Sequence, residues 1–226
     1  MTTLLETRQD SLTSLGDGNT PPMALLRMGI PPMANKWDLF ALQGLMFNAK
    51  QATLGTAIAG STANAAGIVT TAPSFRFSVP TGTTVFPRHL NISFATAAGT
   101  DNEIALAYTD TATYTSGGTA VTPLNLRTDA PAATKVTNCY VAAGSAIVEG
   151  ALTNVRAIYQ DIIPLAFAFA TSYHLMYNVD KWFEQLYPIV GPASVLLWVS
   201  AATTASTIYF SMDWAEVPTK SAITAV

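Results

Sequence analysis

From Trp37 onward, apolar and polar side chains alternate in short runs that are separated by Gly, Pro, Asn and Asp residues. The clearest alternating runs are residues 75–79, 89–94, 104–109 and 208–214. A period of two is typical of antiparallel strands that turn one face toward a core. The pattern therefore predicts an all-β fold, an antiparallel β-sandwich of the jelly-roll-like kind, in a single domain over residues 37–226.

Two runs lack a polar face. Residues 195–199 are apolar throughout, and residues 165–170 place Phe167 and Phe169 on one face with only alanines on the other. A strand without a polar face is covered on both sides. The second cover could be an arm, a long loop or another subunit, or the strand could be central to a barrel. We expect Leu196 and Trp198 to lie at an oligomer contact or under such a cover.

One short helix is predicted in the long connection that precedes the last strands. Asn178 is a suitable N-cap, and Asp180 favours the positive end of a helix dipole. Trp182, Phe183 and Leu186 then form an apolar stripe at helical spacing. We expect this helix to pack on the sandwich or at an oligomer contact, with Trp182 and Phe183 as its contact residues.

Residues 1–36 depart from the alternating pattern. Two Pro-Pro pairs bracket an apolar stretch, and proline fixes φ and removes an amide donor, so a long regular element does not fit. Disordered tails, the alternative, are usually polar and charged. We expect an extended N-terminal arm that docks on a neighbouring molecule. Its contact residues would be Pro21, Pro22, Met23, Leu25, Leu26, Met28, Ile30, Pro31 and Pro32.

The chain is unusually poor in charge. Of its 226 residues 14 are acidic and 11 are basic, which is 11% against roughly 25% in an average domain. So few charges cannot cover the surface, and we infer that much of the exterior packs against other copies or a larger assembly. The net charge of −3 gives no basic footprint for nucleic acid. No apolar run reaches the roughly 20 residues that span a membrane, and we expect neither a membrane partner nor a secretory leader.

Candidate chemistry is sparse. The single cysteine, Cys139, allows neither an intrachain disulfide nor a zinc site built on several thiolates, and the two histidines stand far apart. The carboxylate pairs Asp180/Glu184 and Asp213/Glu216 would suit glycoside hydrolysis only if they faced each other at about 5–9 Å. We predict no catalytic residues, no cofactor and no metal ligands, so that the protein is not an enzyme.

Two segments carry a resemblance to a known family. The run Tyr114-Thr-Ser-Gly-Gly-Thr-Ala-Val-Thr-Pro-Leu-Asn-Leu-Arg127 resembles a recurrent Ser-Gly-Gly-Thr-Ala-(Val/Leu)-Thr-Pro-(Val/Leu)-Asn segment in predicted virion proteins of tailed bacteriophages. The ending, from Tyr187-Pro-Ile-Val-Gly-Pro through a small-residue turn to Tyr209-Phe-Ser-Met-Asp-Trp-Ala-Glu216, is similar to theirs, although Gly191-Pro192-Ala193 stands where Pro-Gly is common. The likeness spans about residues 75–217 and is one of turn and strand pattern.

The resemblance implies a structural protein of a phage particle, of the jelly-roll capsid decoration or cement type, which is commonly trimeric. Such a protein binds the assembled head preferentially and stabilises it by mass action. We therefore expect a homotrimer that binds the major capsid protein through the arm and the base of the oligomer. It would be made in the host bacterial cytoplasm and would lie on the capsid surface of the virion, without a nucleic-acid partner.

Other roles stay open. The protein could be a jelly-roll capsid protein, a tail component or a receptor-binding protein that recognises glycans, with Tyr173, Tyr177 and Tyr187 as stacking candidates. A shell protein that packages nucleic acid would carry an Arg/Lys-rich arm, and residues 1–36 contain only three basic residues. A β-sandwich glycan hydrolase is the least favoured alternative.

Overall fold

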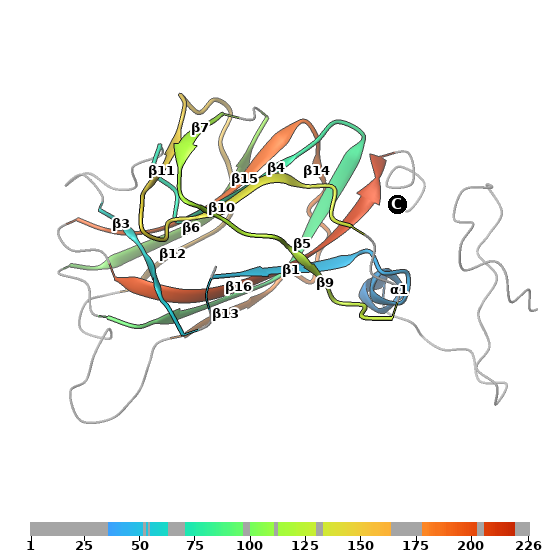
Figure 1. The fold of residues 1–226 in the computed structure, drawn as a ribbon, viewed down its shortest axis with the longest axis horizontal. Helices are drawn as coiled ribbons and strands as arrows, with labels where there is room; N and C mark the ends of the chain where they lie inside the picture. The colour runs from blue at the N-terminus through green and yellow to red at the C-terminus, as the bar shows by residue number, and fades with distance from the viewer. Residues whose placement is uncertain are drawn as a thin grey trace, which may run out of the picture.

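Two antiparallel sheets stacked face to face make up most of the protein in the computed structural model (Figure 1). The structure describes residues 36–51, 53, 55–62, 71–96, 100–110, 113–129, 133–163, 178–202 and 206–219. The prediction of an all-β, jelly-roll-like sandwich with one short helix is confirmed. The predicted arm lies outside the described residues except for Lys36, and so does the apolar run at residues 165–170.

The first sheet, sheet A, has the strand order β13 (Asn178–Trp182), β5 (Thr83–Phe94), β16 (Thr207–Pro218), β1 (Met46–Lys50) and β9 (Leu124–Asn125). Two short strands extend it: β14 (Ile189–Val190) pairs with β5, and β2 (Ile58–Ala59) pairs with β16. The longest pairing joins β5 to β16, from Thr83 opposite Pro218 to Phe94 opposite Ile208. This pair is the spine of the sheet.

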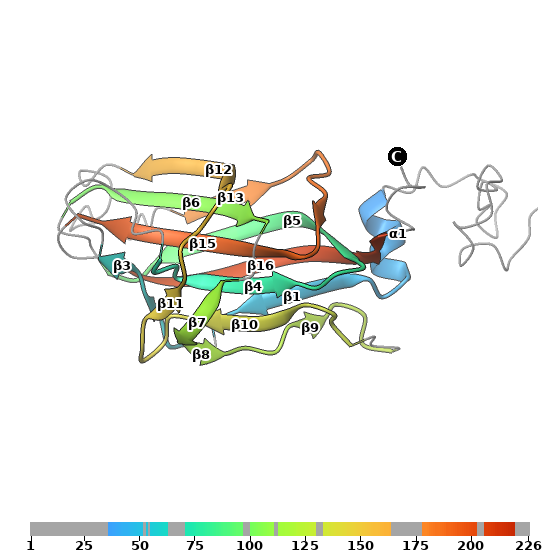
Figure 2. The ribbon, with the colours of Figure 1, turned by 90° about the horizontal axis from the view of Figure 1, so that it is seen from above.

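The second sheet, sheet B, has the order β12 (Arg156–Ile163), β6 (Asn102–Thr109), β15 (Ala193–Ala201), β4 (Phe75–Val79), β10 (Thr137–Val141) and β8 (Thr119–Ala120). Strand β3 (Ser61–Thr62) pairs with β15 in parallel. Strands β7 (Tyr114–Gly117) and β11 (Ile147–Glu149) form a separate two-stranded sheet, here called the flap. Figure 2 shows the flap lying over the outer side of sheet B.

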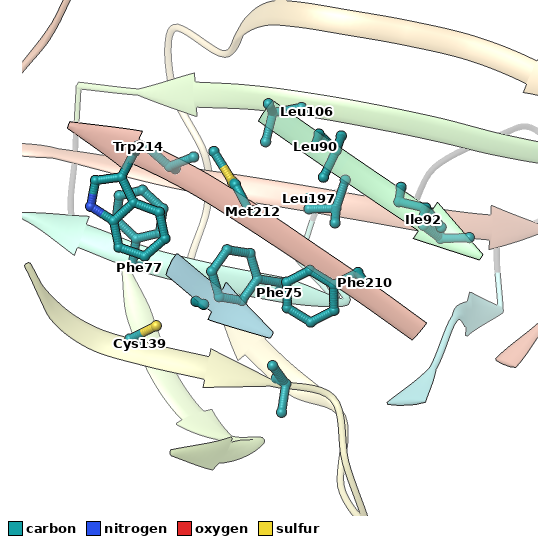
Figure 3. Close-up of a cluster of buried hydrophobic side chains, with 14 of the residues drawn as sticks. Phe75, Phe77, Leu90, Ile92, Leu106, Cys139, Leu197, Phe210, Met212 and Trp214 are labelled. Carbon is teal, nitrogen blue, oxygen red and sulfur yellow. The ribbon is translucent and has the colours of Figure 1, made fainter. Parts of the chain in front are cut away.

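The inward side chains of both sheets meet in a core rich in aromatic rings (Figure 3). The ring centroids of Phe75 and Phe210 are 4.8 Å apart, and those of Phe77 and Trp214 are 4.7 Å apart in a stacked arrangement. Each of these pairs joins a strand of sheet B to a strand of sheet A. Large buried rings contribute more apolar area than any other side chains, so these contacts hold the two sheets together.

The predicted helix at residues 178–186 is wrong. Residues 178–182 form β13, which pairs with β5 along its whole length. Val179 and Phe183 are buried, whereas Asp180 and Trp182 are exposed. The spacing of four residues between Val179 and Phe183 fits a strand as well as a helical stripe. The segment forms a strand because its main chain pairs with β5.

The helix that the structure contains is α1 (Lys36–Leu42), at one end of the sandwich. Its Trp37 and Phe40 are buried together with Phe86, whose ring stacks on Phe40 at 6.1 Å. The sequence pattern places Lys36 in the arm and the residues from Trp37 onward in the β-domain, and it predicts no helix here. The helix therefore covers the end of sheet A, and it does not lie in the connection that precedes the last strands.

Strand β15 is buried along all nine of its residues. On its outer face Leu196 and Trp198 pack with Ala105 and Ala107, and Leu152 lies against this group. The exposed fraction of the Trp198 side chain is therefore only 2%. The chain itself supplies a cover for this strand, from the segment that follows the flap.

Replacement of Trp198 by Lys is expected to abolish cooperative folding. An ammonium group buried without a partner costs several kcal/mol, against a total stability of about 5–15 kcal/mol for a domain. Thermal unfolding followed by circular dichroism measures the effect. Ile162→Lys, on a side chain that is 58% exposed in β12, is the control and should melt with the parent. A Trp198→Lys protein that also melts with the parent would contradict the covered position of this strand.

Candidate functional site

The outer faces of the two sheets differ in character. The outer side chains of the central strands of sheet B are buried beneath the flap and the segment around Leu152, whereas the outward side chains in the middle of sheet A are mostly polar and partly exposed. They form two rows across four strands, because strand register places directly paired residues on the same face. The first row is Trp182, His89, Asp213 and Asn48, and the second is Asp180, Asn91, Ser211 and Lys50. We call these eight residues the polar face.

A β-bulge shapes the first row. The register between β5 and β16 shifts between Asp213 and Trp214, which leaves Arg88 as an extra residue in β5 beside His89. The Arg88 guanidinium carbon lies 5.3 Å from the ring centroids of both Trp37 and Trp182. A bulge bends its strand and re-aims a side chain. Here it brings a cation to the aromatic rings at the border between α1 and the polar face.

His89 is held between two carboxylates. Its Nε2 is 2.5 Å from Asp180 Oδ1, and its Nδ1 is 3.6 Å from Asp213 Oδ2. Asn48 Nδ2 donates a hydrogen bond of 2.6 Å to the other oxygen of Asp213, so that carboxylate is fixed as well. The two carboxylates contact opposite ring nitrogens and do not converge on one point. Among the described residues, no group of three His, Cys, Asp or Glu side chains is placed to hold a metal ion.

Trp182 lies flat against this clamped imidazole. The two ring centroids are 4.0 Å apart and the planes are inclined by 16°. His89 and Arg88 both come from β5, and β13 is the edge strand of sheet A within the described part of the chain. The side chain of Trp182 is 50% exposed. The arrangement leaves half of the indole surface open to solvent, with His89 stacked on the ring and the exposed Asp180 carboxylate two residues away in the same strand.

Sheet B contains a second polar cluster, which is closed. Arg76 Nε lies 2.6 Å from Glu149 Oε1, and both side chains are fully buried. Arg76 Nη2 donates to the hydroxyl oxygens of Ser78 and Ser194 at 2.9 and 2.8 Å, and Thr113 donates to Glu149 Oε2 at 2.8 Å. Arg76 belongs to β4 and Glu149 to β11. The ion pair therefore fastens the flap to the sandwich.

Burial dominates the electrostatics of this pair. It raises the pKa of Glu149 above its ordinary value even though the Arg76 guanidinium acts in the opposite direction. It also lowers the pKa of Arg76, against the attraction of Glu149. Each group is the other's counter-charge in a buried setting, which suits a structural role.

The carboxylate pairs predicted from sequence are not brought together as acid–base pairs. Asp213 lies on the polar face, whereas Glu216 is buried and accepts hydrogen bonds from Trp214 Nε1 at 2.9 Å, Thr134 Oγ1 at 2.6 Å and the Lys135 amide at 2.6 Å. These three hydrogen bonds compensate for the burial of the Glu216 carboxylate. Two of them anchor the loop that contains Thr134 and Lys135. Of the other pair, Asp180 binds His89, and Glu184 is exposed beyond the end of β13.

Cys139 faces the core between the sheets. Burial raises the pKa of its thiol to about 12, which leaves almost no thiolate at neutral pH. Because the thiolate is the reactive form of cysteine, the un-ionised thiol of Cys139 is suited to packing in the core.

One hollow opens at the end of sheet B, with a volume of about 210 Å³. Its lining includes Tyr108, Asp110, Arg156 and Val190. Arg156 Nη2 is 3.9 Å from Asp110 Oδ2, and its guanidinium lies over the Tyr108 ring. The charged groups of the hollow thus interact with each other at its rim.

The structure separates the four predicted contact residues of the sandwich. Leu196, Trp198 and Phe183 are buried at 3% exposure or less, and Trp182 alone among them is open to solvent. Sequence reasoning missed the grouping of Trp182 with Asp180 and His89. The alternation of residues 89–94 and 208–214 predicts a polar face on each of two strands. It does not specify the strand register that places His89 beside Asp180 and Trp182.

No protein-family model matches the chain, and no curated protein or solved structure gives a match. The resemblance to virion proteins of tailed phages therefore stays a prediction. In the described residues, no helix has the length and apolar character needed to cross a bilayer.

Substitution of Arg76 by Met alone is expected to lower the free energy of unfolding by about 3–5 kcal/mol, because it leaves the Glu149 carboxylate buried without its partner. The double variant Arg76→Met/Glu149→Leu should recover most of that loss, since it removes both charges and keeps similar volume. Urea denaturation of the parent and both variants measures the three values. A double variant as unstable as the single one would show that the flap does not depend on charge pairing.

Proposed function

We propose that this protein is a structural, non-enzymatic component of a phage particle, of the capsid decoration or cement type. It assembles as a homotrimer and binds the major capsid protein of the head through residues 1–36 and the base of the oligomer. The observation that carries the proposal is an exposed apolar patch at the end of the sandwich where residues 1–35 join α1.

The patch consists of Leu42, Leu124 and Leu126, whose side chains are 65%, 56% and 48% exposed. Two hydrogen bonds hold their segments together: the Leu126 amide donates to the Met46 carbonyl at 2.9 Å, and the side-chain Nη1 of Arg127 donates to the Leu42 carbonyl at 2.5 Å. Apolar side chains that gather on a surface mark protein contacts, whereas single ones do not. We call these three residues the leucine patch.

The segment that carries the resemblance also builds this patch. Residues 114–127 run through β7 of the flap, β8 at the edge of sheet B and β9 at the edge of sheet A. Leu124 and Leu126 belong to its last part. One continuous segment thus covers the edges of both sheets and contributes two of the three leucines, which links the virion-like sequence to a contact surface.

The composition agrees with assembly. Only 11% of residues are charged, and the described surface keeps several large apolar side chains open to solvent. Burial of such surface between copies or against a shell favours the assembled state, because it removes apolar area from water.

The first prediction from this proposal concerns the oligomer. The full chain should sediment at about three times its monomer mass of 23.9 kDa. Leu124→Glu/Leu126→Glu should shift it to the monomer without loss of folding, because each carboxylate would be desolvated in the contact. Ile162→Glu, an exposed apolar position on β12, is the matched control and should stay trimeric. A parent that is monomeric at all concentrations would contradict the trimer, and a trimeric double variant would contradict the leucine patch as its contact.

The second prediction concerns residues 1–35. Their deletion leaves α1 and the described core intact, so the truncated protein should give the parent's far-UV spectrum and a cooperative melt. It should lose attachment to phage heads, measured by co-sedimentation with heads that lack the protein. Decoration at the occupancy of the full chain would refute the role of the arm.

A further inference from the structure

We infer that the polar face of sheet A is a binding site for a neutral glycan, with one pyranose ring stacked on the exposed part of the Trp182 indole and its hydroxyl groups bound by Asp180 and the neighbouring polar residues. Its centre, Trp182 on β13, lies at the opposite edge of sheet A from β9, whose Leu124 pairs with Asn48 at the end of the first row. The site does not depend on the assembly role proposed above.

The aromatic platform is the first support. A pyranose ring has an apolar face of C–H groups, which packs on the electron-rich face of an indole. Trp182 is the open tryptophan among those of the described chain, at 50% exposure, while Trp37, Trp198 and Trp214 are exposed by 4% or less. Its ring is already fixed by His89 at 4.0 Å, so binding would immobilise little that is free.

The polar groups around the platform are the second support. Sugar hydroxyls donate and accept hydrogen bonds, and they need partners of both kinds close to the ring. The Asp180 carboxylate is 58% exposed and accepts, whereas Asn91 and Ser211 in the same row offer both functions. Most of these side chains are short, so they lose little rotamer freedom on binding. Four strands at a spacing of about 4.8 Å make the rows long enough for more than one sugar ring.

The chemistry of the face favours a glycan over a protein or a nucleic acid. The core of a protein interface is apolar and depleted in charge, but Trp182 is the single large apolar side chain among the eight residues of the polar face. Nucleic acid requires cations for its phosphates. The cations near this face are Arg88, whose guanidinium lies over the rings of Trp37 and Trp182, and Lys50, on β1 away from Trp182. The Asp180 carboxylate beside the platform is 58% exposed and would repel an anionic sugar. A neutral sugar suits the exposed carboxylate, the amide and the hydroxyl groups of this face.

The test begins with the full chain on an array of neutral hexose and N-acetylhexosamine oligosaccharides beside sialylated and uronic-acid glycans. We expect binding to neutral glycans. Each hit is then titrated in solution by tryptophan fluorescence, which should change because the ligand contacts Trp182 directly. Trp182→Ala should weaken binding roughly tenfold or more, the order expected when an aromatic contact and its buried area are lost.

Three further variants sharpen the result. Trp182→Phe should retain part of the affinity, because it keeps an aromatic face, and Asp180→Asn should weaken binding less than Trp182→Ala. Ile162→Ala, at an exposed apolar position on the other sheet, should bind as the parent does. Circular dichroism melts show that each variant is folded. Weak binding by a folded Trp182→Ala protein therefore reports the loss of the stacking face.

The inference is overturned if no neutral glycan binds, if binding survives Trp182→Ala unchanged, or if only anionic glycans bind. None of these outcomes affects the trimer or head attachment, which are measured through the leucine patch and residues 1–35. Failure of the assembly tests would likewise leave the glycan result standing.

Discussion

The buried ion pair between Arg76 and Glu149 determines which surfaces of this protein face the solvent. A two-layer sandwich packs its inner faces together and leaves two outer faces. Here the outer face of β4 carries a guanidinium that is fully buried, and Glu149 of the flap supplies its counter-charge at 2.6 Å. The flap and the segment after it cover the outer side of the central strands of sheet B, including Trp198. The outward polar side chains of sheet A are left partly exposed.

This asymmetry divides the exterior into regions of different chemistry. The polar face lies on sheet A, where short polar side chains surround a half-exposed indole. The leucine patch lies at the end of the sandwich beside α1 and β9. An apolar patch suits contact with protein and a polar face with an aromatic platform suits a sugar, so the proposed assembly role and the proposed sugar site would draw on different side chains.

Alternating patterns in the sequence predicted the sandwich because each inward-facing residue of residues 75–79 and 208–214 contributes to one core. The same reasoning from local pattern failed where a helix and a strand would place their buried residues at the same spacing. Val179 and Phe183 suit a helical stripe and an edge strand equally, and pairing with β5, distant in sequence, decides between them. Arg76 looked like a surface residue because nothing near it in the chain reveals Glu149. The rows of the polar face depend on strand register, which a single sequence does not specify.

Cryo-electron microscopy of phage heads to which this protein has been added tests the account most directly. The proposed structural role predicts threefold β-sandwich density on the outside of the head, with the α1 end directed at the shell, the leucine patch at the contacts between subunits and the Trp182 edge of sheet A turned to solvent. Heads without this density, or density in which the Trp182 edge lies against the shell, would contradict the account.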